Sequence, residues 1–496
     1  MNSLFDNLFI FEMANNHQGD LNHGLTIIRE MAKIARKYNI KAGVKFQYRD
    51  LDTMIHPDYR ERNDIKHIPR FLSTQLTRQE FLTMVEEVRN EGMITICTPF
   101  DEISVRVCLD HGIQILKVAS CSASDWPLLE EIAAAKRPVI ISTGGKNIAD
   151  IDNIYNFFVH RKADFALMHC VGLYPTPNNM LQLQFIERLR QRYPDICIGY
   201  SGHEAPDNLD AVKIAVAKGA SILERHVGIE TESISLNAYS LNPVQADDWV
   251  ASALTAQEIC TVNGPDKYIS QEEIDSLRSL MRGVYAASDI TKDSPLKKEN
   301  VFFAMPSLTN QMTSGQFNVK TKASHDYKTN EPVYENPITS MTNIVRSIIH
   351  DAKGMLYESR VVIGDQFEIE LSHHYGLDHF RQFGALIVNV INREYCKKII
   401  VQLPGQRHPN HQHRVKEETF QLLFGDLEVI LDDKKIAMNQ GDILIVERGN
   451  WHSFSTINGA VIEEISTTHV KGDSYYEDEE INRMDPMERK TILEDW

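Results

Sequence analysis

Short apolar runs alternate with segments of helical spacing through the first half of the chain. Between residues 8 and 226 these runs are LFIFE, GVKFQ, ITICT, ILKVA, PVIIS, FALMH, CIGYS and SILERH. The segments between them, such as LNHGLTIIREMAKIARKYN and NLDAVKIAVAKGA, repeat apolar residues at the spacing of amphipathic helices. Runs that are apolar on both faces are typical of parallel strands covered by helices. The alternation predicts an α/β fold, a closed (β/α)8 TIM barrel, because open doubly wound sheets usually have about five or six strands.

A polar residue ends almost every run. The C-terminal ends of the strands in such a barrel meet on one face, where the active site forms. One polar residue at a strand end is usually part of a turn, but a series of them predicts a functional mouth. The residues at or just after these ends are Glu12, Lys45, Gln47, Thr98, Lys117, Ser120, Ser142, His169, Ser201, His203, Glu224 and His226.

Two lysines in this series indicate an anionic ligand. Lys45 and Lys117 lie inside apolar runs, where an unpaired ammonium group is costly, so the alternative of two surface lysines is less favoured. Nearby hydroxyl groups and the backbone of Thr143-Gly144-Gly145 offer donors to phosphate or carboxylate oxygens. We therefore predict a site for a compact anion at the barrel mouth.

Two histidines indicate a divalent metal at the same mouth. His203 and His226 follow neighbouring strands, and Glu12 lies at the end of a third. Imidazoles placed in this way can share an ion, although two buried histidines are also often just hydrogen-bonded core residues. The neighbouring lysines favour the metal, because an ion beside a bound anion can activate a carbonyl group.

The chain after the barrel changes its pattern twice. Residues of about 282–337 form a short β-rich stretch with many turn residues. From about residue 355 the pattern is that of alternating strands, with the runs RVVIGDQFEIEL, ALIVNVI, KKIIVQL, FQLLFGDLEVIL, DILIV and AVIEEIS. Strands of this kind joined by tight turns predict an antiparallel sandwich or barrel.

Four residues of this last part predict a second metal site. His411 and His413 are two positions apart, so both face the same side of a strand, and Glu418 and His452 follow at spacings that resemble the two cupin motifs. The motifs depart at Glu447, where proline is usual, and at Thr456, where asparagine is frequent. The ion is manganese, zinc, iron or nickel, and the sequence does not choose among them. The alternative is a structural histidine cluster.

Composition and charge remove several classes of function. Lys and Arg number 52 against 69 Asp and Glu, which gives a formal charge of −17 and argues against binding to nucleic acid or anionic membranes. No apolar run approaches the roughly 18 residues of a membrane span, and the N-terminus does not resemble a secretory signal. The seven cysteines are scattered and form no CxxC pair, so we expect a cytoplasmic protein without disulfide bonds.

Several blocks of the first half resemble the sialic acid synthase family. They are FEMANNHQGD, GVKFQ, TPFDE, KVASCSASDWPLL, ISTGG, HCVGLYPTP, GYSGHEAP and ERHVGIE, in order across about residues 8–245. The resemblance implies an enzyme that condenses phosphoenolpyruvate with a sugar aldehyde to give a 2-keto-3-deoxy sugar acid. It places phosphoenolpyruvate on Lys45, Thr98, Lys117, Ser120, Ser142 and Ser201, with Glu224 beside it. It also implies manganese or magnesium on His203 and His226, with Glu12, Gln47 and Tyr174 completing the site.

The chain departs from that family on the acceptor side. The family usually has an acidic residue near position 122, Asn near 172, Asp before the metal-binding histidine, and Asp-His in a later loop. Here Ser122, Gly172, Gly202 and Asn237-Ala238 stand at these places. The anchor for phosphoenolpyruvate is thus retained, whereas the identity of the sugar acceptor is not predicted.

The resemblance extends to the later parts of the chain. The β-rich stretch resembles the antifreeze-like domain of sialic acid synthases, which implies a domain-swapped homodimer, although Met305-Pro306-Ser307 replaces the family's acceptor-binding Arg segment. The strand with His411 resembles that of cupin D-lyxose isomerases, which implies that Lys416 moves protons between an aldose and its ketose. The alternative for Lys416 is a solvated strand residue. We expect three domains, at 1–275, 276–340 and 341–496.

Two other functions stay open at this stage. Lys117 in a barrel strand could form a Schiff base with a carbonyl group, as in a sugar aldolase. The departures at Ser122, Gly172 and Asn237 would also suit a barrel that only binds sugars and serves as a scaffold.

Overall fold

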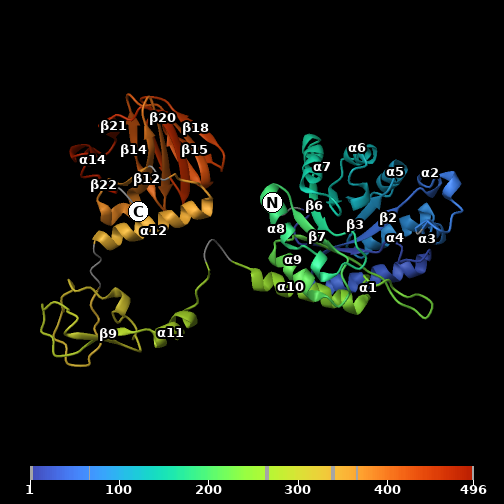
Figure 1. Cartoon of the computed structure of the whole chain (residues 1–496), viewed down its shortest axis with the longest axis horizontal. Helices are drawn as coiled ribbons and strands as arrows, with labels where there is room; N and C mark the ends of the chain where they lie inside the picture. The colour runs from blue at the N-terminus through green and yellow to red at the C-terminus, as the bar shows by residue number, and fades with distance from the viewer. Residues whose placement is uncertain (1–3, 66, 263–266, 337–340, 365–366, 494–496) are drawn as a thin grey trace. The chain divides into compact units, whose positions relative to one another are not determined.

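The computed structural model describes residues 4–65, 67–262, 267–336, 341–364 and 367–493. The chain divides into two compact units, Met1–Thr261 and Val262–Trp496 (Figure 1). The first unit is a barrel, and the second carries the β-rich remainder. Among the described residues, no helix combines the length and apolar character needed to cross a lipid bilayer.

The first unit contains the predicted closed barrel of eight parallel strands. Strand β8 pairs with β1 in parallel and so closes the sheet. The strands, in barrel order, are β1 (Leu8–Glu12), β2 (Lys41–Tyr48), β3 (Ile94–Pro99), β4 (Ile115–Val118), β5 (Val139–Ser142), β6 (Phe165–Cys170), β7 (Ile198–Gly202) and β8 (Ile222–His226).

Helices surround this barrel (Figure 1). Capping side chains start most of the longer ones, and Thr77 and Asn147 each form a complete capping box that satisfies free backbone N–H groups. The α-helices are α1 (Leu21–Tyr38), α2 (Leu51–Met54), α3 (Ile68–Ser73), α4 (Arg78–Asn90), α5 (Glu102–Asp110), α6 (Trp126–Ala134), α7 (Ile148–His160), α8 (Gln184–Arg192), α9 (Leu209–Ala217) and α10 (Pro243–Cys260). Short 3-10 turns are η1 (Pro57–Tyr59), η2 (Ser120–Ser122) and η3 (Asn178–Met180).

Alternate residues of each strand belong to two separate cores. On β1, Leu8 and Ile10 pack inside the barrel, whereas Phe9 and Phe11 pack outside against Trp249 of α10. The interior core also contains Ile96, Ile115, Ile140, Ala166, Met168 and Ile222. This alternation is the ordinary consequence of the two-residue period of a strand.

The same alternation sets which polar residues face the barrel interior. Lys117 follows the interior residue Ile115 by two positions, and Glu224 follows Ile222 in the same way. On β6 the interior position is Cys170, not His169 as the sequence pattern suggested. The ring of His169 lies outside the strands and contacts the carbonyl of Leu181 at 2.7 Å.

The second unit begins with α11 (Gln271–Leu280) and a small β-rich region. Two short antiparallel strands, β9 (Gly283–Ala286) and β10 (Val301–Ala304), are followed by the 3-10 turn η4 (Ser314–Gln316). A compact apolar core holds the region together, with Val284, Ile290, Leu296, Met312 and Tyr327 among its members. Residues 337–340, at the predicted end of this domain, lie outside the described residues.

The rest of the unit contains the predicted cupin fold, two antiparallel sheets facing one another. The first has the order β18-β15-β20-β13-β12-β11-β22, and the second has the order β17-β16-β19-β14-β21. The strands are β11 (Glu368–His373), β12 (Gly384–Asn392), β13 (Tyr395–Gln402), β14 (Arg407–His413), β15 (Glu418–Gly425), β16 (Leu427–Leu431), β17 (Lys434–Met438), β18 (Ile443–Val446), β19 (His452–Ser455), β20 (Ala460–Thr467), β21 (Ser474–Tyr476) and β22 (Lys490–Leu493).

Helices in this part are α12 (Met341–Ser359), α13 (Phe380–Phe383) and α14 (Glu479–Arg483), with the 3-10 turn η5 (Leu377–His379). Helix α12 was not predicted, although Ile344, Ile348, Ala352 and Leu356 recur every four residues and pack on the first sheet. The predicted strand RVVIGDQFEIEL begins only at Glu368. Val361 and Ile363 instead pack against the core without strand pairing, and residues 365–366 lie outside the described residues.

Candidate active site and metal centre

Buried ion pairs connect the strand ends at the barrel mouth. The ammonium group of Lys45 lies 2.5 Å from a carboxylate oxygen of Glu12 and 2.7 Å from one of Glu224. Ser201 donates a hydrogen bond to the same oxygen of Glu224, at 2.9 Å. Burial lowers the pKa of Lys45, but the two carboxylates outweigh this effect and the pKa is raised. Lys45 is therefore a fixed cation in the interior of the mouth.

Lys117 is a second buried cation, with fewer partners. Its ammonium group donates to the hydroxyl of Ser142 and lies 3.8 Å from Glu224. Only 1% of the residue is exposed, and this burial lowers its pKa to about 8, against the opposing effect of Glu224. Burial also raises the pKa of Glu224, but Lys117 and Lys45 reverse this and leave it lowered.

The charges at the mouth balance before any ligand binds. Lys45 and Lys117 carry two positive charges, and Glu12 and Glu224 carry two negative charges when ionised. A bound anion therefore needs further positive charge close by. A divalent cation next to these residues would supply it.

The two predicted metal-binding histidines come together beside this cluster. The rings of His203 and His226 lie 5.4 Å apart, and β1 and β8 place His226 in register with Glu12. Burial lowers the pKa of His203 to about 4 and that of His226 well below its usual value, so both are neutral near pH 7. Nδ1 of His226 is buried without a hydrogen-bond partner. A neutral imidazole with an unused nitrogen has the chemistry of a metal ligand, so these residues fit a divalent ion.

A buried ion pair behind the histidines joins β7 to β8. Glu204 pairs with Arg225, and the hydroxyl of Tyr200 donates to the other carboxylate oxygen at 2.7 Å. A Cβ atom at Gly202 would lie 2.5 Å from the carboxylate of Glu204, so that carboxylate fills the space beside Gly202. The chain therefore supplies a buried acid from position 204, where the resembling family has aspartate at the position of Gly202.

Breaking this pair is expected to destabilise the barrel. Arg225 and Glu204 are 1% and 0% exposed, so Arg225→Met leaves a buried carboxylate with only Tyr200 as a side-chain partner. We expect the free energy of unfolding to fall by about 3–5 kcal/mol. The double variant Arg225→Met/Glu204→Gln should recover most of that loss. Denaturant unfolding measures the free-energy change in the single and in the double variant. Hydrogen exchange of β7 and β8 identifies which transition belongs to the barrel. A loss below about 1 kcal/mol in the single variant would contradict this view.

The other predicted residues of the mouth lie at different distances from this centre. Tyr174 is 55% exposed and its ring packs 4.3 Å from that of His203. Ser120 accepts a hydrogen bond from the backbone of Gly144 at 2.9 Å, and Thr98 is buried at the end of β3. Gln47 accepts a hydrogen bond from Arg49 at 2.7 Å, and both residues line a small cavity that includes neither Lys45 nor Lys117. The structure thus connects Glu12, Lys45, Lys117, Ser142, Ser201 and Glu224 directly.

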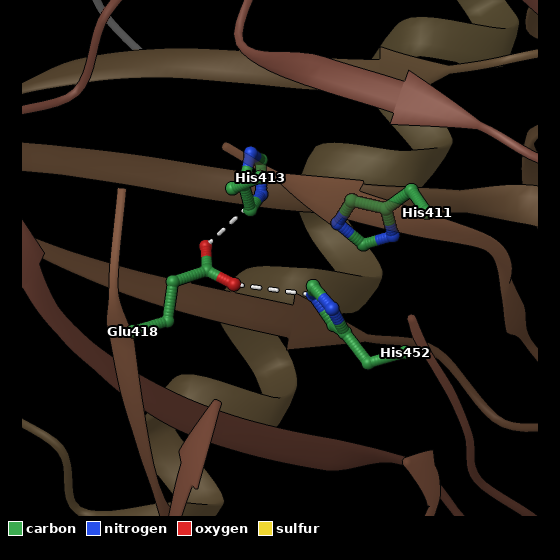
Figure 2. A group of neighbouring side chains, drawn as sticks. All are labelled: His411, His413, Glu418 and His452. Atoms are coloured by element: carbon green, nitrogen blue, oxygen red, sulfur yellow. Dashed lines mark ion pairs between the residues drawn. The ribbon is translucent and has the colours of Figure 1, made fainter. Parts of the chain in front are cut away.

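The predicted tetrad forms a compact group in the cupin. Strands β14 and β19 place His411 directly opposite His452, and His413 lies two residues further on β14. Glu418 begins β15 and reaches His413 at 3.4 Å and His452 at 3.1 Å (Figure 2). One ligand atom from each of the four residues lies within 4.8 Å of the others. All four residues are buried.

Backbone carbonyl groups orient the three rings of the tetrad. Nδ1 of His411 contacts the carbonyl of Pro409 at 3.1 Å, Nδ1 of His413 contacts that of Asp473 at 2.9 Å, and Nδ1 of His452 contacts that of Asn450 at 3.2 Å. A carbonyl oxygen only accepts, so each Nδ1 carries the hydrogen and each Nε2 keeps its lone pair. This arrangement fixes the tautomer that a divalent metal requires.

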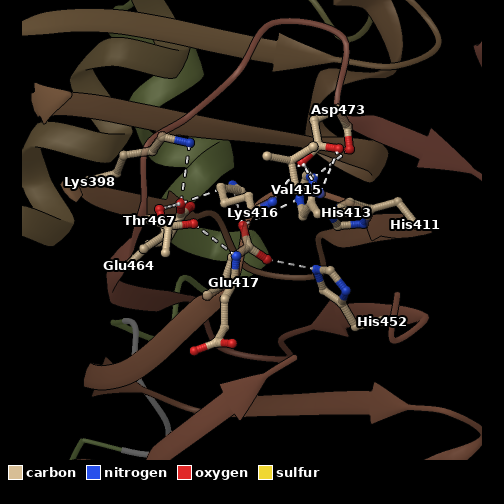
Figure 3. Close-up of polar contacts among 12 residues, drawn as sticks. Lys398, His411, His413, Val415, Lys416, Glu417, His452, Glu464, Thr467 and Asp473 are labelled. Atoms are coloured by element: carbon tan, nitrogen blue, oxygen red, sulfur yellow. Dashed lines mark hydrogen bonds and ion pairs between the residues drawn. The ribbon is translucent and has the colours of Figure 1, made fainter. Parts of the chain in front are cut away.

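Lys416 lies inside the site rather than on the surface. It is 3% exposed, pairs with Glu418, and lies 3.1 Å from Glu464 (Figure 3). Lys398 also approaches Glu464, at 3.4 Å, and Ser466 donates to it at 3.1 Å. Burial lowers the pKa of Lys416, but the two glutamates raise it above its usual value. A buried acid–base pair therefore adjoins the tetrad, and the alternative of a solvated strand lysine is wrong.

Asp473 holds the turn that carries this lysine. Its carboxylate accepts backbone hydrogen bonds from Arg414 at 3.0 Å, Val415 at 3.1 Å and Lys416 at 2.8 Å (Figure 3). Its own carbonyl group meets His413. One residue thus positions both a ring of the tetrad and the adjacent lysine.

Several residues of both sites were not identified from sequence. Glu204 and Arg225 belonged to quoted motifs but carried no spacing signal of their own. Tyr239, whose ring lies 5.1 Å from that of His226, follows the Asn237-Ala238 segment. In the cupin, Glu464 is a polar residue on the buried side of the run AVIEEIS, which is a signal that could have found it.

Comparisons with known proteins agree with both parts of the chain. A family model described as the NeuB family matches residues 31–264, and a cupin domain model matches residues 399–461. A crystal structure from Chromobacterium violaceum, of a protein assigned as spore coat polysaccharide biosynthesis protein E, is 43% identical. It covers 66% of this chain and 97% of its own, with a TM-score of 0.63.

Curated relatives match the first part of the chain. Pseudaminic acid synthase of Campylobacter jejuni is 27% identical over 64% of this chain and 93% of its own length. N-acetylneuraminate-9-phosphate synthase of Drosophila melanogaster is 28% identical over 54% of this chain and 72% of its own.

Proposed function

The chain belongs to the NeuB family, and we propose that its barrel condenses phosphoenolpyruvate with a sugar aldehyde. The products are a 2-keto-3-deoxy sugar acid of the nonulosonic type and phosphate, and the acid serves polysaccharide biosynthesis. The observation that carries this proposal is the pair of buried lysines, Lys45 and Lys117, beside the paired rings of His203 and His226. The names of the relatives, which are synthases of related acids, support it.

The residues of the mouth have distinct roles in this reaction. Lys45, Lys117 and the hydroxyls of Ser142 and Ser201 hold the carboxylate and phosphate of phosphoenolpyruvate. The methylene carbon of the enol attacks the aldehyde carbon, and the aldehyde oxygen takes up a proton. Water then adds to the cationic carbon that bears the phosphate, and the tetrahedral intermediate expels phosphate to leave the keto group. The fixed ammonium groups stabilise the negative charge of the anion throughout.

A divalent ion, manganese or magnesium, completes this site in the proposal. His203 and His226 would hold it, with Glu12 next to them in the sheet. When bound, such an ion withdraws electrons from the aldehyde oxygen. The chain's own contribution is to keep both rings neutral through burial and to orient His203, whose Nδ1 lies 3.0 Å from the carbonyl of Val171.

Phosphate release tests this proposal against its two rivals. Incubating the protein and manganese with phosphoenolpyruvate and a panel of hexoses, pentoses and their N-acetyl derivatives should release phosphate only when an acceptor is present. A scaffold would release none with any acceptor. A Schiff-base aldolase using Lys117 would be inactivated by borohydride with pyruvate, whereas the synthase should survive that treatment and lose activity with a chelator.

The pKa of Lys117 predicts how the reaction depends on pH. Because burial lowers this pKa to about 8, the ammonium form predominates below that pH and is lost above it. We expect kcat/KM for phosphoenolpyruvate to decline about tenfold per pH unit above about pH 8. Lys117→Arg, which stays protonated, should have a lower rate but no such decline. A parent profile that stays flat to about pH 10 would contradict this assignment.

We also propose a sugar isomerase or epimerase activity for the cupin, which would hold a divalent ion on its tetrad. The observation that favours it is the burial of Lys416 between Glu418 and Glu464, next to the tetrad. Such a pair can take a proton from one carbon of a sugar and return it to the neighbouring carbon. Incubating the full chain with candidate aldoses in deuterium oxide, without phosphoenolpyruvate, tests this. Exchange at C2 is expected, and its absence with every aldose would refute the activity.

The domain organisation is part of the same proposal. We infer three functional domains, at 1–275, 276–340 and 341–496, and a swapped homodimer in which the small β-rich region serves the partner's barrel. Sedimentation of the full chain as a monomer at catalytic concentrations would contradict the dimer.

A further inference from the structure

We propose that the cupin cavity binds a sugar that carries a carboxylate or phosphate group, and that Arg489 holds this group. The inference deepens the isomerase activity proposed above and rests on it for the identity of the ligand as a sugar. It goes further by assigning the charge of that sugar and the residue that recognises it.

The cavity is large enough for such a ligand. It has a volume of about 420 Å³ and opens beside the tetrad residues His411, His413 and Glu418. The C-terminal segment also contributes to its lining, with Asp485, Met487 and Arg489. A pentose or hexose derivative fits within this volume. The reactive and recognition ends of the cavity therefore come from different parts of the chain.

Arg489 is the least satisfied cation of this lining. Its Nε atom is buried and has no hydrogen-bond partner, and no carboxylate of the described residues forms an ion pair with its guanidinium. The guanidinium instead lies 5.1 Å from the centre of the Tyr476 ring. Arg489 directly precedes β22, and its backbone is fixed there because its carbonyl accepts a 2.8 Å hydrogen bond from the backbone N–H of His373, at the end of β11. Arg489 as a whole is half-buried, and a buried guanidinium nitrogen without a partner is costly unless a ligand supplies an acceptor.

Most of the other charges of the cavity lining are paired. Lys490 pairs with Glu370 at 3.0 Å, and Lys398 and Lys416 share Glu464. Asp485 accepts a hydrogen bond from the backbone of Met487 and so stabilises its own turn. Lys471, at the exposed rim, is the other cation without an ion pair among the described residues. The lining as a whole carries five Lys and Arg side chains against four carboxylates, Asp485 included, so one positive charge is in excess.

The middle of the cavity can bind hydroxyl groups. Nδ1 of His408 contacts the carbonyl of Pro409 at 3.1 Å, so it carries the hydrogen and leaves Nε2 as an acceptor. Nε2 of His374, 3.0 Å from that nitrogen, must then donate. Nδ1 of neutral His374 is left as a buried acceptor without a partner, as a sugar hydroxyl requires.

One aromatic ring contacts both Arg489 and a residue of the tetrad. The ring of Tyr476 stacks on that of His411 at 5.4 Å, and the guanidinium of Arg489 lies over the same ring, 5.1 Å from its centre. A sugar held at one terminus by Arg489 can thus place its opposite terminus near the tetrad. Aldose–ketose chemistry occurs at that opposite end, next to the carbonyl carbon.

Binding measurements on the full chain test the inference without requiring turnover. The probes are arabinose 5-phosphate, arabinonate and arabinose, titrated calorimetrically into a Lys117→Met background, in which anion binding by the barrel is weakened. At least one charged probe should bind about tenfold or more tightly than arabinose. Arg489→Met should remove that advantage without changing the affinity for arabinose, and Arg489→Lys should keep part of it. Arg483→Met, on the exposed helix α14, is the matched control and should behave as the parent.

The outcomes separate this inference from the activity on which it rests. Equal affinity for all three probes would overturn the anion site. So would charged-probe affinities in Arg489→Met that stay within about twofold of those measured without this substitution. Preference for arabinose 5-phosphate or for arabinonate identifies the natural group as phosphate or carboxylate. If a charged probe binds through Arg489 but no aldose exchanges hydrogen, the anion site stands and the isomerase activity does not.

Discussion

Lys117→Met is expected to lower kcat/KM for phosphoenolpyruvate by about 100- to 1,000-fold, the loss typical of one fixed group that stabilises charge at a reacting centre. The substitution keeps the apolar stem of the side chain and removes its charged ammonium group. Glu224 keeps its contacts with Lys45 and Ser201, so the barrel should remain folded. Steady-state phosphate release with a productive acceptor measures the change.

Lys41→Met is the matched control for this variant. Lys41 lies at the beginning of β2, at the opposite end of the barrel from the strand ends that form the mouth, and bonds to the carbonyl of Asp6 at 2.9 Å. The kcat/KM of Lys41→Met for phosphoenolpyruvate should stay within about twofold of the parental value. If Lys117→Met retained parental kcat/KM, the assignment of the barrel mouth as the anion site would be wrong.

His452→Ala is expected to remove the metal of the cupin. The ring contributes one of four converging ligands. Loss of a residue that only hydrogen-bonds to a metal ligand lowers metal affinity by up to about a hundredfold, so loss of a ligand itself should lower it by at least that much. Elemental analysis of the purified chain should show one equivalent of metal fewer. Hydrogen exchange at C2 of the sugar should disappear, whereas phosphate release by the barrel with a supplied acceptor should persist.

His379→Ala serves as the control here, because His379 lies in the same fold but is exposed and outside the tetrad. It should keep both the metal and the exchange activity. Parental metal content in His452→Ala would show that the four residues form a structural cluster, which is the alternative that the sequence left open.

The positions of the barrel residues follow from local pattern, and this is why the sequence could predict them. A strand of period two that is apolar at Ile222 places Glu224 and His226 on the same interior side. The same rule, applied strictly, would have put Cys170 at the mouth and excluded His169. The tetrad could be predicted from the sequence for a similar reason. Two of its residues lie on one face of a strand and a turn brings the third close, so local geometry fixes the arrangement.

Features that depend on long-range packing could not be predicted. Nothing near Lys416 indicates that Glu464, nearly fifty residues later, will bury it. Gly202 is a departure in sequence, yet Glu204 fills the space beside it only because Arg225 on the next strand holds its carboxylate there. Arg489 is an ordinary surface residue by pattern, and it lines the cavity only because β22 pairs with β11.

Product analysis with isotopically labelled phosphoenolpyruvate tests the central claim most directly. The protein, manganese and phosphoenolpyruvate labelled in all its carbons are incubated with mixed hexoses, pentoses and their N-acetyl derivatives, and the products are resolved by mass spectrometry. We expect a new sugar acid that contains all three labelled carbons, formed in step with free phosphate. Unchanged phosphoenolpyruvate with every acceptor, or labelled pyruvate as the sole product, would contradict it.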